Sequence, residues 1–296
     1  PQIGFADSRV KQVMKLMLPA LFGVSVAQIN LLLDTLLASL LQPGSVSWLY
    51  YSDRLMELPL GVFGIAIATV ILPGLSRQHA AQDTQAFTAT LDWAVRMILL
   101  IGVPAALALW VLAEPLLATL FHYGAMQDRD ILLSAASLRA YALGLLAFML
   151  IKVFAPGYFA RQDMKTPVRY GIWAMAANMV FNLALIWHFK HVGLAMATTL
   201  SAFLNAGLLG WGLKRQGIWL ATAGWGIWWL RLGVANGCLL GLLLWLRGSV
   251  SNWLEWSMWQ RIEHLGLLVL GGLVCYLLVL LLCGVRKHHL QGPVDK

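Results

Sequence analysis

Three charged residues lie within about one helical turn of one another inside a long apolar run. Asp53, Arg54 and Glu57 interrupt residues 48–76, a stretch long enough to cross a membrane. A charge near the bilayer centre costs roughly 2.5–3.5 kcal/mol or more, so these groups should face a wet cavity or partners rather than lipid. A guanidinium in such a place suits phosphate, which it binds through paired hydrogen bonds. The alternative is that Arg54 only holds Asp53 or Glu57 in place.

A second polar group is spread over three other apolar runs. Its members lie in pairs, namely Asn30 with Asp34, Asn178 with Asn182, and Thr198 with Thr199. Residues four apart share a helix face, so Asn30 with Asp34, and Asn178 with Asn182, each present two oxygen-bearing groups to one side. One carboxylate, two amides and a hydroxyl suit a small hard cation such as sodium. The alternative is a network of hydrogen bonds between helices.

The composition is that of an integral membrane protein. Of 296 residues, 60% are hydrophobic and 11% are charged, whereas soluble domains carry about 25% charged residues. The net charge of +8 comes mainly from short links between apolar runs, without a basic stripe interleaved with aromatic residues. We therefore expect an all-α polytopic membrane protein that binds no nucleic acid.

The apolar runs predict eight membrane spans. We place them near residues 14–41, 52–75, 92–113, 134–158, 168–189, 192–213, 226–246 and 264–285. One set of links carries most of the cations: Arg9, Lys11, Lys15, Arg77, Arg161, Lys165, Arg169, Lys214, Arg215, Arg286 and Lys287. The opposite links carry Arg129, Lys190, Arg247 and Arg261. The excess of positive charge predicts that both ends of the chain lie in the cytoplasm.

Several smaller patterns add expectations about the helices. Prolines lie within or beside the spans, at Pro19, Pro59, Pro73, Pro104 and Pro156, and such interrupted helices often line cavities in transporters. Simple packing irregularity is the alternative. Tryptophans at 225, 228, 229, 253, 256 and 259 are expected to anchor the chain at the membrane surface. Gly237 and Gly241 form a GxxxG step that permits close helix packing.

Two long segments resemble the MurJ family of lipid II flippases, which is related to the MATE and polysaccharide exporters. They are LPLGVFGIAIATVILPGLSRQ at 58–78 and AFMLIKVFAPGYFARQDMKTPVRYGIWAMAANMVFNLAL at 147–185. The second contains the pattern K-V-x-x-P-x-x-x-A-R-Q-D-x-x-T-P-V from Lys152 to Val168. This pattern is long enough to be specific, and the resemblance extends over essentially the whole chain.

The resemblance implies how the chain is divided. Residues 1–215 would be the second, C-terminal six-helix lobe of a two-lobe transporter, and residues 216–296 two additional helices that form a groove for a lipid tail. The first lobe would be missing from this chain and is its expected partner. A chain that begins with Pro1 rather than Met agrees with a piece of a longer protein.

The resemblance also implies roles for the two polar groups. Arg54 matches an essential arginine of a cationic cavity that receives the diphosphate and sugar head of the lipid, and Asp53 and Glu57 match acidic positions near it. The sodium site described for homologues is matched by Asp34, Asn178, Asn182 and Thr198. Asn182 stands where relatives can have an acid. The neutral asparagine removes one negative charge and would therefore weaken cation binding. Apart from sodium, no cofactor is expected.

Together these patterns predict a lipid flippase rather than an enzyme. The expected substrate is the undecaprenyl-diphosphate-linked precursor of peptidoglycan, moved between leaflets of the bacterial inner membrane by alternating access for cell wall biogenesis and cell shape. The runner-up is a multidrug or oligosaccharide-lipid exporter of the same superfamily. A transferase acting on polyprenyl diphosphates would need an acidic metal cluster, but the cytoplasmic links offer only the isolated Asp83 and Asp163. A purely structural scaffold has no use for charges within the membrane.

Overall fold

The apolar runs of the sequence form long helices in the computed structural model, which describes residues 28–219 and 224–286. The described residues contain helices and turns and no strand, which confirms the all-α expectation. The first half of the first expected span, including Pro19, lies outside the described residues, as do Arg9, Lys11, Lys15 and Lys287.

The helices follow one another with short connections. Residues 28–39 are helical. They are followed by α2 (Ser45–Pro59), the π-helix η1 (Leu60–Ile65), α3 (Ala66–Ala80), α4 (Thr84–Val111), α5 (Ala113–Phe121), α6 (Asp128–Phe159), α7 (Lys165–Arg215), α8 (Trp225–Leu246), α9 (Val250–Glu255) and α10 (Met258–Leu282).

Six helices of the described chain are long and apolar enough to cross a membrane. They include α7, with 51 residues, and the continuous helix from Ser45 to Ala80 that α2, η1 and α3 form together. The backbone of Lys190 lies outside the helical region, so α7 consists of two helices joined at a sharp bend. With α7 counted as two crossings and residues 28–39 as the end of another, the structure agrees with the expected spans.

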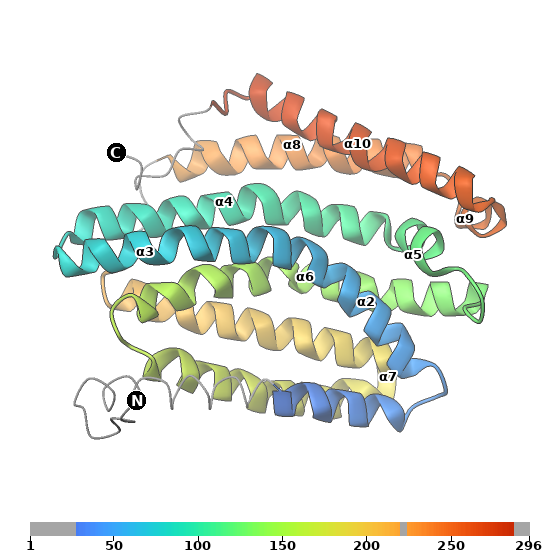
Figure 1. Ribbon diagram of the computed structural model, residues 1–296, viewed down its shortest axis with the longest axis horizontal. Helices are drawn as coiled ribbons and strands as arrows, with labels where there is room; N and C mark the ends of the chain where they lie inside the picture. Colours follow the sequence, from blue (N-terminus) through green and yellow to red (C-terminus); the bar gives the residue numbers. More distant parts are fainter. Residues whose placement is uncertain (1–27, 220–223, 287–296) are drawn as a thin grey trace, which may run out of the picture.

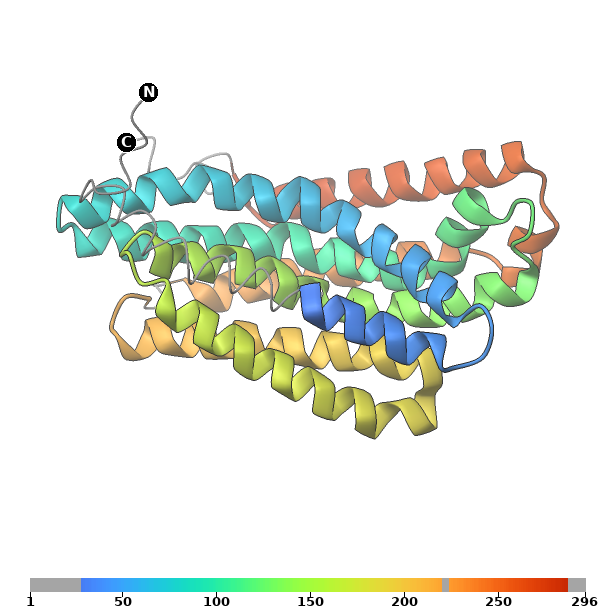
Figure 2. The same cartoon turned by 60° about the horizontal axis from the view of Figure 1, so that its bottom comes forward.

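Helix α6 lies at the centre of the bundle. It packs against α2, α4, α5 and α7, and its buried side chains include Leu138, Leu145 and Met149. Helices α8 and α10 pack against each other in a separate layer beside α4 (Figure 1). The turned view shows the two halves of α7 on the side away from α10 (Figure 2). We refer to Ser45–Arg215 as the α2–α7 bundle and to Trp225–Leu282 as the α8–α10 hairpin.

Polar side chains cap the N-termini of α4 and α6, and a glycine precedes α2. The Asp83 carboxylate accepts a hydrogen bond of 2.9 Å from the backbone N–H of Ala86 at the start of α4. Gln127 and Asp130 form a reciprocal capping box at the start of α6. Before α2, Gly44 has φ +97°, and a Cβ there would lie 2.7 Å from the Trp48 ring. Only glycine fits this approach without strain.

The bend in α7 depends on close contact between its two halves. Lys190 has φ 52° and ψ −128°, so the chain reverses within a few residues. A Cβ added at Gly193 would lie 2.6 Å from the backbone oxygen of Leu185, closer than real Cβ atoms approach. The absence of a side chain at Gly193 therefore lets the second half begin directly against the first.

Two of the expectations about the last helices are wrong. Trp228 and Trp253 are 3% and 1% exposed, so they are packing residues and not surface anchors. A Cβ at Gly237 or Gly241 would have nothing within 4 Å among the described residues, so this GxxxG step makes no close helix contact there. The close approach in the hairpin is made instead by Gly272 of α10, where a Cβ would lie 3.1 Å from the Leu239 side chain of α8. Trp229 and Trp259 are exposed, as expected of anchors.

We predict that Gly193→Ala destabilises the protein, because its Cβ collides with backbone that cannot rotate away. Overpacking of this kind costs about 1–3 kcal/mol. Gly207→Ala is the matched control, since it lies on the second half of α7 and a Cβ there meets nothing within 4 Å. The measurement is the thermal unfolding midpoint of the purified protein. Equal midpoints for the two variants would contradict the tight contact at the bend.

Candidate functional site

Two hydrogen bonds fix α2 against the central helix α6. The indole Nε1 of Trp48 donates to Asp130 Oδ1 at 2.8 Å. The hydroxyl of Ser52 lies 2.7 Å from the backbone oxygen of Ser134 on α6. These contacts lie on the turns just before the charged residues, so the opposite face of α2 is held outward.

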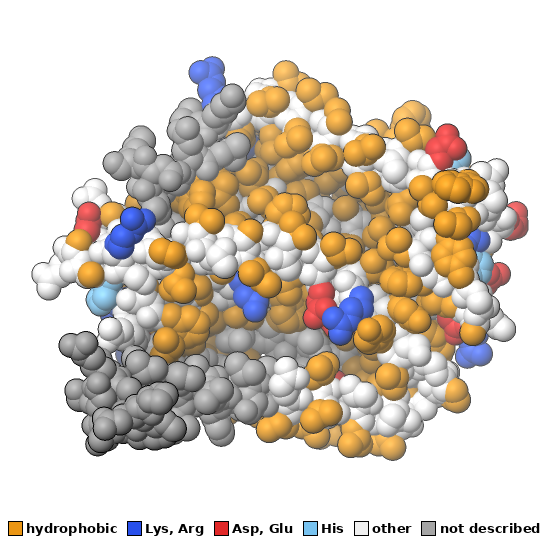
Figure 3. Space-filling view, viewed as in Figure 1, with side chains coloured by type: hydrophobic (Ala, Val, Ile, Leu, Met, Phe, Trp, Pro, Cys, Tyr) orange, Lys and Arg blue, Asp and Glu red, His pale blue; other side chains and the backbone are white. Residues whose placement is uncertain are grey.

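Arg54 and Glu57 form an ion pair on this outward face. Arg54 Nη1 lies 2.6 Å from Glu57 Oε2, and the two side chains are 53% and 47% exposed. The guanidinium also lies over the Tyr50 ring, 5.0 Å from its centroid. The space-filling view shows acidic and basic side chains lying together over α2, within a largely hydrophobic surface (Figure 3). The pair is therefore accessible on a face that is otherwise apolar.

Asp53 does not share this ion pair. It is half-buried, and no ion pair or hydrogen bond of its side chain occurs within residues 28–219 and 224–286. Only one of the two carboxylates predicted to hold Arg54 does so in this structure. Glu57 is the positioning partner because it lies three residues away on the same helix face.

Lys152 is a further cation that the sequence reasoning did not single out. It lies on α6, where it is exposed, and its Cγ is 3.8 Å from the position of a Cβ built at Gly64 of η1. In the described part of the chain its ammonium makes no ion pair. The signal was available, since Lys152 interrupts an apolar run just as Arg54 does.

The second polar group comes together as a buried network. The Asn182 amide nitrogen donates to Asp34 Oδ1 at 2.6 Å and to Asn178 Oδ1 at 2.9 Å. Thr198 Oγ1 lies 3.4 Å from Asp34 Oδ2 and 3.4 Å from Asn178 Nδ2. Asn178 and Asn182 are fully buried. The four predicted residues thus meet at the junction of the helix at 28–39 with both halves of α7.

Neighbouring polar residues divide between this network and other contacts. Asn30 joins it, with its amide nitrogen 3.4 Å from Asp34 Oδ2. Thr199 does not, because its hydroxyl donates to the backbone oxygen of Ala140 on α6 at 2.8 Å. Two oxygens of the network are buried and accept no hydrogen bond from the described residues, namely Asn30 Oδ1 and Asn182 Oδ1.

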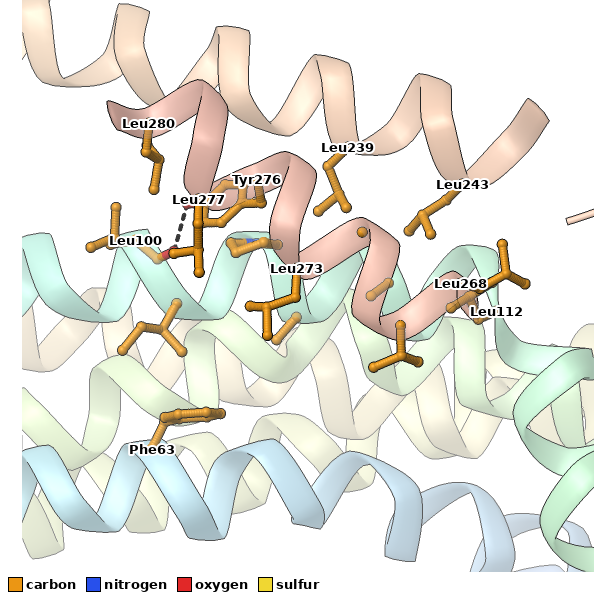
Figure 4. Close-up of a pocket in the computed structure, with 16 residues that line it drawn as sticks. Phe63, Leu100, Leu112, Leu239, Leu243, Leu268, Leu273, Tyr276, Leu277 and Leu280 are labelled. Carbon is orange, nitrogen blue, oxygen red and sulfur yellow. Dashed lines mark hydrogen bonds between the residues drawn. The ribbon is translucent and has the colours of Figure 1, made fainter. Parts of the chain in front are cut away.

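An apolar pocket of about 420 Å³ lies between α4 and the α8–α10 hairpin. Its lining includes Leu100, Pro104 and Ala108 from α4, Leu239 and Leu243 from α8, and Leu268, Gly272 and Tyr276 from α10. Figure 4 shows the leucine side chains of α8 and α10 pointing toward α4. Such a cavity suits a hydrocarbon chain and offers little to a polar ligand.

Comparisons with known proteins agree on one family. The sequence model of the family described as "Lipid II flippase MurJ" matches residues 1–264. The chain is 51% identical over its full length to the "Probable lipid II flippase MurJ" of Vibrio cholerae, of which it covers 56%. It is 48% identical to the protein of the same name from Haemophilus influenzae, with 98% of this chain and 58% of that protein aligned. The chain thus spans little more than half the length of these relatives.

Solved structures give the same fold. The "Lipid II flippase MurJ, inward closed conformation" superposes with a TM-score of 0.73 at 23% identity, over 91% of this chain and 54% of that one. An outward-facing MATE multidrug transporter superposes with a TM-score of 0.61 at 15% identity, over 94% of this chain and 64% of that one. The fold is common to both groups, whereas the family model and the sequence identities single out one of them. This multi-pass, all-helical membrane chain belongs to the MurJ family.

Proposed function

We propose that this chain contributes the second lobe and two additional helices of a flippase that moves lipid II from the inner to the outer leaflet of the bacterial inner membrane. The names of its relatives support this substrate. On this proposal the protein is a transporter and not an enzyme, and its first lobe is the principal partner. The boundary near residue 215 falls where α7 ends and the separate α8–α10 layer follows.

The observation that carries the proposal is the accessible guanidinium of Arg54. A diphosphate is best bound by a planar, permanently charged group that makes paired hydrogen bonds. The Glu57 carboxylate keeps Arg54 on the outward face until the ligand arrives, and because an exposed ion pair is weak it can be exchanged for phosphate. Lys152 adds positive charge on the neighbouring α6.

A sodium ion suits the network around Asp34. A half-turn of the Asn182 amide would bring its unpartnered oxygen toward Asp34 Oδ1 and Asn178 Oδ1, and three oxygens facing one another repel unless a cation lies between them. Thr198 would supply a further oxygen. A single carboxylate suits a monovalent ion, and no cluster of three or more His, Cys, Asp or Glu that could hold a metal occurs in the described residues. Bound sodium would neutralise Asp34 and tie the first helix to α7.

The pocket beside α4 suits the polyprenyl tail. It is apolar and lies in the layer that contains the two additional helices. A tail seated there stays in hydrocarbon surroundings while the charged head occupies the face of α2. The measurement for this assignment is protection of a cysteine in the pocket by a polyprenyl lipid.

The orientation rests on where the cations lie. One end of the bundle carries Arg77, Arg161, Lys165, Arg169, Lys214, Arg215 and Arg286. At the other end Arg261 is 6% exposed and donates to the backbone oxygens of Ala118 and Leu254, which leaves fewer cations free to interact with lipid head groups. By the positive-inside rule, this distribution supports an orientation with the α3–α4, α6–α7 and α7–α8 connections in the cytoplasm.

We predict that Arg54→Lys fails in a complementation assay nearly as badly as Arg54→Ala, because an ammonium cannot make the paired hydrogen bonds. Glu57→Gln, which removes the charge of its partner, should retain most activity. Full activity of the lysine variant at normal protein levels would refute the bidentate geometry. If Arg54 served only to hold the fold, its variants would instead be lost from the membrane.

We predict that cysteines at Ala125 and Ser251 react with an impermeant thiol reagent in intact cells, whereas cysteines at Ala81 and Gln216 react only after lysis. All four positions are exposed and lie in connections or short helices at the bundle ends. The reverse labelling pattern would overturn the proposed orientation.

We predict that sodium, but not potassium, raises the thermal midpoint of the purified protein. At 100 times the dissociation constant the stabilisation would be about 2.7 kcal/mol. Asp34→Asn and Thr198→Val should abolish the response and Asn182→Asp should strengthen it. Thr199→Val is the matched control, since its hydroxyl binds Ala140 outside the network. An identical response of all variants to both ions would leave only an interhelical hydrogen-bond network.

A further inference from the structure

The α8–α10 hairpin contacts α4 at a backbone carbonyl that a proline has left without its helical partner. In an α-helix the oxygen of residue 100 accepts from the N–H of residue 104. Residue 104 is proline, which has no N–H. The Tyr276 hydroxyl of α10 donates to Leu100 O at 2.6 Å and so replaces the missing donor (Figure 4).

The same arrangement recurs at the end of α4. Val111 is the last residue of α4, and the residue four positions further is Pro115. Arg247, at the end of α8, donates from Nη1 to Val111 O at 3.0 Å. Two residues of the hairpin therefore bind two carbonyls that prolines free, roughly 16 Å apart along the helix at 1.5 Å per residue.

Three other prolines within the described helices lack such a side-chain donor from another helix. In the described ranges, no side chain from another helix donates to the carbonyl four residues before Pro59, Pro73 or Pro156. Pairing with a proline-freed carbonyl is thus confined to the face of the bundle that the hairpin covers. Pro104 also lines the apolar pocket, so its ring and the Tyr276 hydroxyl together keep free polar groups out of the pocket wall.

We infer that Tyr276 and Arg247 are positioning residues that fix the hairpin against α4 and so set the width of the apolar pocket. Apolar helix faces in a membrane have little tendency to choose one register, because lipid is as apolar as leucine. These two hydrogen bonds and the 2.9 Å bond from the Trp225 indole of α8 to Asp92 of α4 hold the hairpin at three points along α4. The identity of the molecule that occupies the apolar pocket rests on the proposed function. The contact between the hairpin and α4 does not depend on it.

The experiment is a double-mutant cycle in the full-length protein. The three free cysteines, Cys238, Cys275 and Cys283, are replaced by alanine, and Leu268→Cys places a thiol on the pocket wall. The rate of its reaction with a lipid-soluble maleimide reports separation of the hairpin from α4. Tyr276→Phe should raise this rate roughly three- to tenfold, as for loss of one interhelical hydrogen bond. With Pro104→Ala also present it should have little further effect, because the alanine supplies the N–H that the proline lacks.

Tyr158→Phe is the matched control. Its hydroxyl also donates to a buried carbonyl, Leu209 O at 2.8 Å, but Leu213 retains an N–H four residues further. Its effect on the labelling rate should be the same with and without Pro104→Ala. Equal effects of Tyr276→Phe in both backgrounds, or none in either, would overturn the inference.

A second double-mutant cycle tests the contact between Arg247 and the Val111 carbonyl in the same way. Arg247→Leu should raise the labelling rate when residue 115 is proline and have little effect in Pro115→Ala, and equal effects in both would overturn this part. Protection of the thiol introduced at position 268 by added undecaprenyl diphosphate is measured separately. Failure of protection would reject the tail site and leave the docking results standing.

Discussion

The backbone polar groups within the membrane-spanning part of this bundle need partners inside the protein, because the surrounding hydrocarbon supplies none. Each unsatisfied backbone group in such surroundings costs several kcal/mol, which is why membrane-spanning segments are helices. A proline removes the N–H that would bind the carbonyl four residues earlier. At Leu100 and Val111 a side chain from another helix donates to that carbonyl instead. These partners fix points of the α8–α10 hairpin against α4.

The same constraint distinguishes buried charge pairs from accessible ones. Glu114 and Arg139 form a pair of 2.6 Å in which the glutamate is 5% exposed, and removal of one partner from such a pair costs about 3–5 kcal/mol. Asp92 likewise is buried and accepts from Arg96 and from the indole of Trp225. The Arg54–Glu57 pair is half-exposed on the face of α2, where its groups remain free to change partners.

The continuous helix that carries Arg54 has an irregular backbone. Directly after Pro59 the chain forms the π-helix η1, which continues into α3 and its Pro73. Wider turns of this kind are frequent at functional sites. The π-helix η1 therefore begins just after the accessible Arg54 and Glu57. On the preceding turns of α2, Trp48 and Ser52 remain hydrogen-bonded to α6.

The sequence by itself determined the membrane class, the helical spans and the residues to examine. Charges such as Arg54 within apolar runs, and the i to i+4 pair Asn178 and Asn182, are local patterns, and local patterns are visible in one dimension. Only the tertiary structure decided that Asp34 meets Asn182, that Asp53 stays apart from the ion pair, and that Thr199 turns to Ala140. It also reversed the expectations for Trp228, Trp253 and the GxxxG step, and revealed that Tyr276 serves the carbonyl freed by Pro104. These outcomes depend on which helix faces which, and packing sets this between residues up to 176 positions apart in the chain.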